Sequence, residues 1–465
     1  MATATSGAGN GAAEGDRLHR AISPKMLLFF VLGDILGAGI YARVGGVAGE
    51  VGGAIWLAFL VAMILAVFTA CSYVELVTKF PGAAGAALYC HKAYRSRFFT
   101  FMVAFAVLAS GIASASAVAR AFAGRYLEAF VTVPEVPVAL VFVLALAAIN
   151  FRGVSESVKA NIALTLVELT GLLVIVVVGI AALASGEGDP GRAFSFSQDR
   201  NVIFAVLGGA AVAFYALLGF EDAVNMAEET QDPVRVFPRA LLDGMLIAGV
   251  LYLVIGFVAS MVVESERLAA STGPLLEVVE ASPIAIPPRL FAAIALVAIA
   301  NTALINMIMA SRGVYGMARQ GVIPAAMGAT HSARRTPWVA IVFTTLIALV
   351  LVSFGNLADL ADTTVALLLL VFAIVNVSVL VLRRRPVGHR HFVTPTALPY
   401  LGAVTCLALL GQLLWDDAQE GGRIFLFAGG LLAVGLVLWL VNVAVGGRVE
   451  GEVDPVPVPQ PQPQA

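Results

Sequence analysis

The chain contains 465 residues, of which 60% are hydrophobic and 12% are charged, and its mean hydropathy is +0.93. An ordinary soluble domain carries about 25% charged residues, so this composition excludes a water-soluble protein and predicts an all-α integral membrane protein with many spans. The formal net charge of −2 gives no support to a nucleic-acid partner. The three cysteines lie in or beside apolar runs, so we expect them to pack as small hydrophobic residues rather than form disulfides.

The two ends of the chain differ in composition from everything between them. Residues 1–24 are small and polar and lack the apolar segment of a signal peptide, and within 448–465 the stretch "VDPVPVPQPQPQA" alternates proline with valine or glutamine. Neither composition can build a packed core, so we predict a disordered cytoplasmic tail at each end.

Apolar runs of about 20 residues indicate membrane-spanning helices, and the sequence contains twelve runs of this kind. In chain order they lie near 26–48, 55–77, 98–123, 136–151, 160–184, 202–227, 239–263, 289–318, 337–355, 361–382, 398–415 and 424–446.

The distribution of Lys and Arg among the connecting segments predicts the orientation in the membrane. One set of connections holds most of the basic residues, including "RRRPVGHR" at 383–390, whereas the opposite set is acidic. Basic connections stay on the cytoplasmic side, so we expect a multi-pass protein of the plasma (cell inner) membrane with both termini in the cytoplasm.

The first apolar run is interrupted by "GDILGAGIY" at 33–41. Gly37 lies about eleven residues, or roughly 16 Å, into this run, which is near the membrane midplane. Non-helical backbone is tolerated there only where it is buried in protein or lines a wet cavity. The spacing of Gly33 and Gly37 is also typical of close helix packing, so a packing role and a binding site are both open at this point.

A second interruption lies in the sixth run, "AFYALLGFEDAVNMAEETQDP" at 213–233, where apolar character stops at Gly219. Transporters with inverted repeats carry a discontinuous helix at the corresponding position of each half, and runs one and six correspond in a five-plus-five repeat. This pairing favours a binding site over simple packing.

The chemistry of two broken helices predicts the class of substrate. Unwinding exposes backbone N–H groups at the positive amino end of the half-helix after Gly39, which attract a carboxylate. Freed carbonyls near Tyr215 and Ala216 can accept hydrogen bonds from an ammonium group. A zwitterion such as an α-amino acid satisfies both ends.

Several segments, taken in order, resemble the amino acid–polyamine–organocation (APC) family of permeases. "GDILGAGIY" resembles the G-[SAT]-G-I signature of its first helix, and "GFEDAVNMAEETQDPVRVFPRAL" (219–241) resembles its sixth helix and following loop. Further similarities are "INFRGVSESVKAN" (149–161), "ASRGVYGMARQGVIP" (310–324) and, more loosely, "FPGAAGAALYCHKAY" (80–94).

The resemblance implies a LeuT-type fold that transports amino acids by alternating access. Residues 25–385 would form the five-plus-five inverted repeat, with helices one and six broken at mid-membrane, and residues 386–447 would add helices eleven and twelve. The substrate-binding residues that it implies are Gly37, Ala38, Gly39 and Ile40 on the first helix, and Phe214, Tyr215, Ala216, Leu218 and Gly219 on the sixth. Tyr215 would act as a gate, with simple packing as the alternative. Ala38 replaces a Ser or Thr of many relatives, so only backbone contacts are expected there.

Acidic residues inside a membrane are costly and point to function, and four occur here: Asp34, Glu75, Glu168 and Glu221. Glu75 lies close to a helix end, where a structural role is expected. By the resemblance, Glu168 stands where sodium-independent relatives have a lysine, which makes it the leading candidate for proton coupling. Arg312 is its predicted partner, and a permanent ion pair is the alternative.

Asp34 and Glu221 are further candidates for proton coupling. Glu221 follows the sixth-helix break, where it would sense protons, contact substrate or cap the unwound segment. Three polar residues of the eighth run would form hydrogen bonds between helices. They are Asn301, Thr302 and Asn306.

Short sequence motifs can indicate an enzyme instead of a transporter. No H-E-x-x-H, G-x-S-x-G or phosphate-loop motif is present, and all five histidines fall in predicted cytoplasmic segments. We therefore expect no enzyme, no cofactor and no metal site. A channel or receptor is a second rival class, and it would differ from a transporter because its flux would show neither saturation nor counterflow. The expected function is proton-coupled uptake of a neutral amino acid, with membrane lipid as its surroundings. The alternative is an exchanger of amino acids or polyamines, including cationic substrates.

Overall fold

A computed structural model describes residues 22–445 except 83–84, 154–157, 198–200, 333 and 335, and describes no side chains for 158–161. The two predicted tails lie outside these residues, apart from 22–24. Ile22 forms an isolated β-bridge with Thr230, the one β-type pairing of the described chain. The first helix then begins at Pro24 with Ser23 as its cap.

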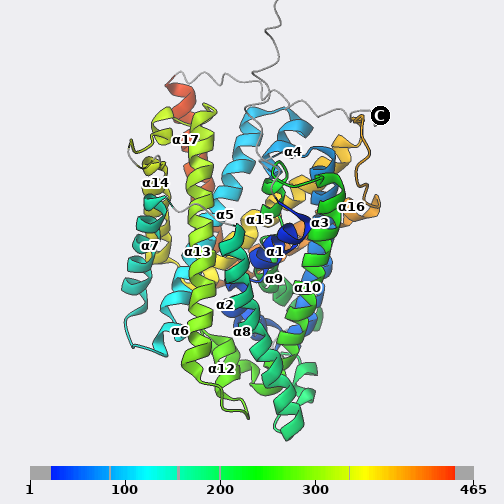
Figure 1. The fold of residues 1–465 in the computed structure, drawn as a ribbon, viewed down its shortest axis with the longest axis vertical. Helices are drawn as coiled ribbons and strands as arrows, with labels where there is room; N and C mark the ends of the chain where they lie inside the picture. The colour runs from blue at the N-terminus through cyan, green and yellow to red at the C-terminus, as the bar shows by residue number, and fades with distance from the viewer. Residues whose placement is uncertain are drawn as a thin grey trace, which may run out of the picture.

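All regular elements of the described residues are helical (Figure 1). The α-helices are α1 (Pro24–Ile35), α2 (Ala38–Val51), α3 (Ile55–Lys79), α4 (Gly85–Tyr94), α5 (Arg97–Ala123), α6 (Arg125–Glu128), α7 (Glu135–Arg152), α8 (Val158–Ser185), α9 (Val202–Phe214), α10 (Pro233–Val262), α11 (Ser265–Ala270), α12 (Pro274–Glu280), α13 (Pro288–Arg319), α14 (Trp338–Phe354), α15 (Leu357–Leu382), α16 (Ala397–Glu420) and α17 (Arg423–Ala444). Short 3₁₀ turns are η1 (Pro190–Phe194), η2 (Tyr215–Leu217), η3 (Asp222–Met226) and η4 (Ala325–Gly328).

Ten helical segments within the described residues are long and apolar enough to cross a membrane. They involve α3, α5, α7, α8, α9, α10, α13, α15, α16 and α17. Helices α1 and α2 meet the same criteria together as one bent span, which makes eleven. The apolar helix α14 coincides with the predicted run at 337–355 but has only 17 residues. The all-α membrane fold is thus confirmed, whereas the number twelve stays a prediction.

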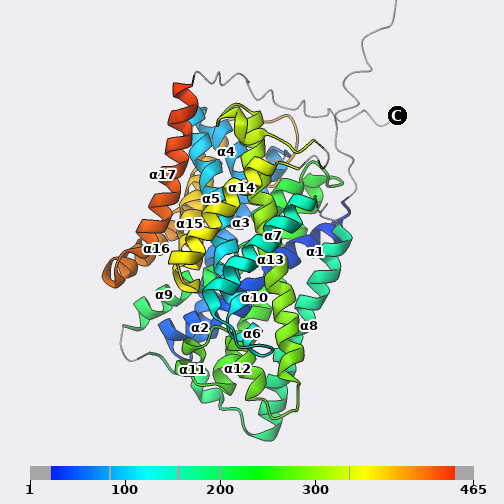
Figure 2. The same ribbon diagram turned by 90° about the vertical axis from the view of Figure 1, so that its left-hand side faces the viewer.

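The ends of the bundle are occupied by different short helices. Figure 2 shows α4 and the end of α17 at one end, and α11 and α12 at the other. We call these the α4 end and the α12 end. Helices α1 and α2 lie within the bundle, where α1 packs against α8 and α10, and α2 packs against α9 and α11.

The first predicted break is present between Ile35 and Ala38. Gly37 leaves the helical conformation with φ −55° and ψ −155°, and the axes of α1 and α2 differ by 40°. Glycine suits this position because a Cβ atom on Gly37 would lie 2.5 Å from the hydroxyl oxygen of Thr302. The close packing predicted as an alternative is therefore real, and it coexists with the break.

The second predicted break follows α9. After η2 the chain is extended at Leu218, and Gly219 has φ +115°, a conformation that side-chain-bearing residues rarely adopt. A Cβ atom on Gly219 would lie 2.7 Å from the backbone oxygen of Asp34, so the two breaks are in direct contact.

At the α12 end, Glu277 of α12 joins two neighbouring segments. Its carboxylate accepts hydrogen bonds from Arg125 Nε at 3.2 Å and Arg267 Nε at 2.8 Å. Burial alone would raise the pKa of Glu277, but the hydrogen bonds and charges of Arg267 and Arg125 outweigh burial and hold this pKa below its usual range. These contacts join α12 to α11 and to the start of α6.

At the α4 end, Glu75 of α3 is 1% exposed and pairs with Arg383, which follows α15. Arg383 Nε and Nη2 donate to the two carboxylate oxygens at 2.8 and 2.6 Å, and the Thr394 amide donates at 2.9 Å. The structural role expected for Glu75 is the one observed. The segment 383–396 is thereby tied to α3.

We predict that Arg383→Met lowers stability by about 3–5 kcal/mol, because it leaves a buried carboxylate without its cation. The double variant Glu75→Gln/Arg383→Met should recover at least half of this loss, since glutamine keeps an oxygen for the Thr394 amide. Thermal unfolding of the purified protein in detergent measures both effects. A double variant as unstable as the sum of the two single variants would contradict this account.

Candidate functional site

A cavity of about 230 Å³ lies where the two breaks meet. Residues from the α1–α2 break, from α5, from the segment between α9 and η3, and from α13 and α15 form its wall. The lining residues are Asp34, Ile35, Gly37, Ala38, Gly39, Ala104, Val107, Leu108, Ser110, Gly111, Ser114, Tyr215, Ala216, Leu218, Gly219, Glu221, Asp222, Asn225, Thr302, Asn306, Met309, Ala310, Gly313, Thr364 and Leu368.

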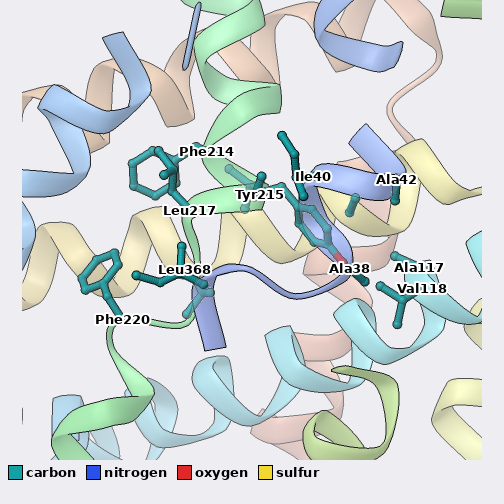
Figure 3. Packing of buried hydrophobic residues seen from close by; sticks show 14 of the residues in the cluster. Ala38, Ile40, Ala42, Ala117, Val118, Phe214, Tyr215, Leu217, Phe220 and Leu368 are labelled. Atoms are coloured by element: carbon teal, nitrogen blue, oxygen red, sulfur yellow. The ribbon is translucent and has the colours of Figure 1, made fainter. Parts of the chain in front are cut away.

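Most of the residues predicted to bind substrate line this cavity. Those that do are Gly37, Ala38, Gly39, Tyr215, Ala216, Leu218 and Gly219. Ile40 and Phe214 do not belong to the lining. Phe214 packs against Phe372 of α15 with ring centroids 6.1 Å apart, and Figure 3 shows its ring on the side away from Tyr215 and Ala38.

The amino end of α2 faces the cavity. Its N-cap is Gly37, which has no side chain to accept hydrogen bonds from the first-turn amides. The Ala38 amide instead donates to Thr302 Oγ1 at 3.0 Å. The amides that follow Ala38 have no acceptor within the helix, because the first four N–H groups of any helix lack one. This end of the cavity can therefore hold an anion.

Helix α9 packs antiparallel alongside α2, with Gly46 against Val212 and Gly209 against Val51, so the carbonyl end of α9 reaches the same point. A Cβ atom on Gly39 would lie 2.6 Å from Ala216 Cα, so the backbones of α2 and η2 are in contact. The last carbonyls of a helix carry partial negative charge. Partial charges of both signs thus face one small cavity.

Tyr215 is held by a hydrogen-bonded chain across three helices. Its hydroxyl lies 3.0 Å from Ser114 Oγ of α5, and Asn306 Nδ2 of α13 donates to the same Ser114 oxygen at 3.1 Å. The predicted hydrogen bonds of Thr302 and Asn306 to other helices are therefore present. Ser114 was not predicted, because a serine within "GIASASAVA" carries no signal beyond small size.

The charged residues of the lining are all acidic: Asp34, Glu221 and Asp222. Glu221 Oε2 accepts a hydrogen bond from the Gly219 amide at 2.9 Å, which matches the capping role foreseen for it. No Lys, Arg or His is among the lining residues that the structure describes. Like charges in one cavity repel, so this wall favours a bound cation or protons.

Glu168 of α8 lies outside the cavity wall and is fully buried. Its Oε1 accepts a hydrogen bond from Asn301 Nδ2 at 3.2 Å, and its Oε2 has no partner within the described residues. The predicted partnership with Arg312 is wrong, because Arg312 is exposed. Arg312 also forms no ion pair in the described part of the chain.

Two buried tyrosine hydroxyls donate to backbone carbonyls around the first break, and one of these carbonyls belongs to Glu168. The Tyr41 hydroxyl donates to the Glu168 backbone oxygen at 2.9 Å. The Tyr252 hydroxyl donates to the Ile35 backbone oxygen at 2.5 Å, which satisfies a carbonyl freed by the end of α1.

The cavity extends from the breaks toward the α4 end. Its wall on α5 runs from Ser114 back to Ala104, and its wall on α13 runs from Thr302 on to Gly313. On the α12 side, the buried Arg43 of α2 forms an ion pair with Asp362 of α15, whose side chain is 15% exposed. Helices α11 and α12 also pack on α2 there.

Comparison with known proteins gives the class of protein that this fold and cavity define. The profile described as "Amino acid permease" matches residues 22–444. The chain belongs to this family of membrane transporters, which are not enzymes.

Relatives of the chain carry different substrate names. It is 24% identical to the branched-chain amino acid permease BcaP of Bacillus subtilis (strain 168) over 86% of this chain and 89% of that protein. It is 27% identical to the vacuolar cationic amino acid transporter 2 of Arabidopsis thaliana, over 81% of this chain and 62% of that protein. It is 23% identical to the methylthioribose transporter of Bacillus subtilis (strain 168), over 91% of this chain and 93% of that protein.

We predict that Gly39→Ala lowers amino acid uptake at least tenfold. The added methyl group would lie 2.6 Å from Ala216 Cα, and two backbones cannot separate without widening the cavity. Gly316→Ala is the matched control, since a Cβ atom on this α13 glycine has no neighbour within 4 Å. Uptake into proteoliposomes, at equal amounts of folded protein, measures both. Unchanged uptake by Gly39→Ala would show that the close approach has no role in transport.

Proposed function

We propose that this protein is a secondary active transporter that moves amino acids across the plasma membrane by alternating access. Its architecture would be twelve spans with a LeuT-type five-plus-five inverted repeat and two additional helices. The observation that carries this proposal is the meeting of two helix breaks, at Gly37 and Gly219, on one cavity. Breaks at corresponding positions of two halves are the mark of such repeats.

The substrate would lie between the two breaks. Its carboxylate would accept hydrogen bonds from the first-turn amides of α2, beginning at Gly39. Its ammonium group would face the carbonyl end of α9. The apolar surface of Ala38 and Leu218 would then contact an uncharged side chain, so a neutral amino acid is the first candidate.

Alternating access would proceed from the conformation described here. The cavity reaches toward the α4 end, and the Arg43–Asp362 pair and Tyr215 stand between it and the α12 end. Basic residues of α4 and of segment 383–390 lie at the α4 end, which supports a cytoplasmic α4 end and cytoplasmic termini. Opening toward the outside would require α2 and α15 to separate at this ion pair.

Glu168 is the proposed proton-coupling residue. A buried carboxylate with one unsatisfied oxygen is costly when charged, so Glu168 would gain a proton readily when its surroundings stay dry. A shift of α8 that follows protonation would reach the first break through the hydrogen bond from the Tyr41 hydroxyl, three residues beyond Ala38, to the Glu168 backbone oxygen. Asp34 and Glu221 line the cavity itself and are the second choices.

An exchanger of cationic amino acids or polyamines is the second candidate function. The favouring observation is the wall with three carboxylates and no basic residue among the described lining residues. Relatives named as cationic amino acid transporters are consistent with it. In this candidate, the acids would neutralise a second ammonium group on the substrate instead of binding protons.

Uptake of a labelled amino acid panel into proteoliposomes, with and without an inward proton gradient, tests the first proposal. We expect gradient-driven accumulation in the wild type and at least a tenfold loss of it in Glu168→Gln. Asp243→Asn is the control, because Asp243 is an exposed acid of α10 that lies outside the cavity wall.

Two results would contradict proton-coupled uptake. Accumulation that persists in Glu168→Gln would remove this residue from the coupling step. Uptake that ignores the gradient but requires amino acid inside the vesicles would make the protein an exchanger. If no amino acid or amine shows saturable uptake, the proposed substrate class is wrong.

For the second candidate, we expect Asp222→Asn to raise the KM for lysine or putrescine at least tenfold while leaving the KM for leucine within twofold. The reason is that only a second ammonium group would interact with Asp222. Glu229→Gln is the control, an acid of the same segment outside the cavity wall. Equal effects on lysine and leucine would argue against charge selection.

A further inference from the structure

A second cavity, of about 190 Å³, lies at the α4 end of the bundle. It is bounded by the end of α3, by α4, by the end of α15 and by the segment that follows α15. The lining residues are Phe80, Lys92, Leu382, Arg385, Pro386 and Val387. None of them lines the transport cavity, so this is a separate site.

Two cations face this cavity. The Lys92 ammonium lies 5.0 Å from the centre of the Phe80 ring, and the Arg385 guanidinium donates a hydrogen bond to the Lys92 backbone oxygen. Neither side chain forms an ion pair within the described residues. The nearby acid Glu75 is already occupied by Arg383 and the Thr394 amide. Burial lowers the pKa of Lys92, as expected for a half-buried ammonium that lacks a counter-ion.

The rest of the wall is apolar. Phe80, Leu382, Pro386 and Val387 surround the two cations, which suits an anion that carries hydrocarbon beside its charge. Phe80 and Leu382 lie at the ends of the spans α3 and α15, where the apolar and polar regions of a membrane meet. Basic pockets between helices at this level are suited to lipid phosphates.

We propose that this cavity binds the head group of an anionic phospholipid. The lipid phosphate contacts Lys92 and Arg385, and the glycerol and the first methylene groups of its chains contact the apolar wall. The proposal does not depend on the transported substrate.

The bound lipid connects the α15–α16 segment to α4. Helix α4 reaches the second break through edge-to-face ring contacts, since the ring centroids of Tyr89 and Tyr73 lie 6.2 Å apart and those of Tyr73 and Phe220 lie 5.9 Å apart. A phosphate that joins Lys92 to Arg385 therefore stabilises the arrangement of helices around the α4 side of the transport cavity.

Thermal unfolding of the purified full-length protein, delipidated in a neutral detergent, tests the proposal. Phosphatidylglycerol, phosphatidylcholine and inorganic phosphate are titrated separately. We expect phosphatidylglycerol alone to raise Tm in a saturable way, because a ligand that binds only the folded state stabilises it. The variant Lys92→Gln should bind phosphatidylglycerol at least tenfold more weakly, and Lys92→Arg should restore binding.

The matched control is Arg384→Gln, which removes an exposed charge next to Arg385 but outside the cavity. It should leave the phosphatidylglycerol titration within twofold of the wild type. Equal stabilisation by phosphatidylcholine, or the same loss in Arg384→Gln as in Lys92→Gln, would overturn the proposal. Stabilisation by inorganic phosphate to the same extent would assign the cavity to a free anion instead of a lipid. If Lys92→Gln unfolds on purification, Lys92→Met and Arg385→Gln provide the same comparison.

Discussion

Backbone polar groups inside a membrane must find partners within the protein, and this constraint shapes the centre of the molecule. The chain interrupts two spans, between α1 and α2 and after α9, and places the interruptions against each other. Gly39 lies against Ala216, and Gly219 lies against the backbone of Asp34. Thr302 and Tyr252 satisfy two of the groups that the first break exposes. Other amides of the α2 amino end and carbonyls of the α9 carboxyl end lie at the cavity, where the carboxylate and the ammonium group of a zwitterionic substrate would form hydrogen bonds with them.

The buried and half-buried acids of the helices differ in their partners. Glu75 and Asp362 each pair with an arginine, which neutralises the carboxylate while the contact lasts. Glu168 has only the side chain of Asn301, a neutral donor, and leaves one oxygen without a partner. A neutral donor does not fix the charge of a carboxylate as an arginine does. This difference supports Glu168 as the proposed coupling residue over Glu75.

The sequence was sufficient for features that depend on local composition. Hydropathy located the apolar helices, of which ten or eleven among the described residues could cross a membrane, and Gly37 and Gly219 indicated the breaks. Backbone that leaves the helix is tolerated within a membrane only where it is buried in protein or lines a cavity. What the sequence missed concerns orientation and distance. The side chains of Ile40 and Phe214 do not line the cavity although their neighbours do, since one step along a helix turns a side chain by about 100°. Their role in binding stays a prediction. Arg43 meets Asp362 across more than 300 residues, and no local pattern indicates such a contact.

The Arg43–Asp362 pair also limits how the proposed transport cycle can work. Separating a buried pair leaves two charges that each need a new partner or water, which costs several kcal/mol. Outward opening would admit water to both charges and so reduce that cost. The inward-facing and outward-facing states would then differ mainly in which end of the bundle is hydrated. In the intermediate that is closed at both ends, the substrate would form hydrogen bonds with the free backbone groups of both breaks and so stabilise it. In this mechanism the ion pair would keep the α12 side closed while the cavity faces the α4 end. Substrate binding at the two breaks would supply the free energy for the transition to the outward-facing state.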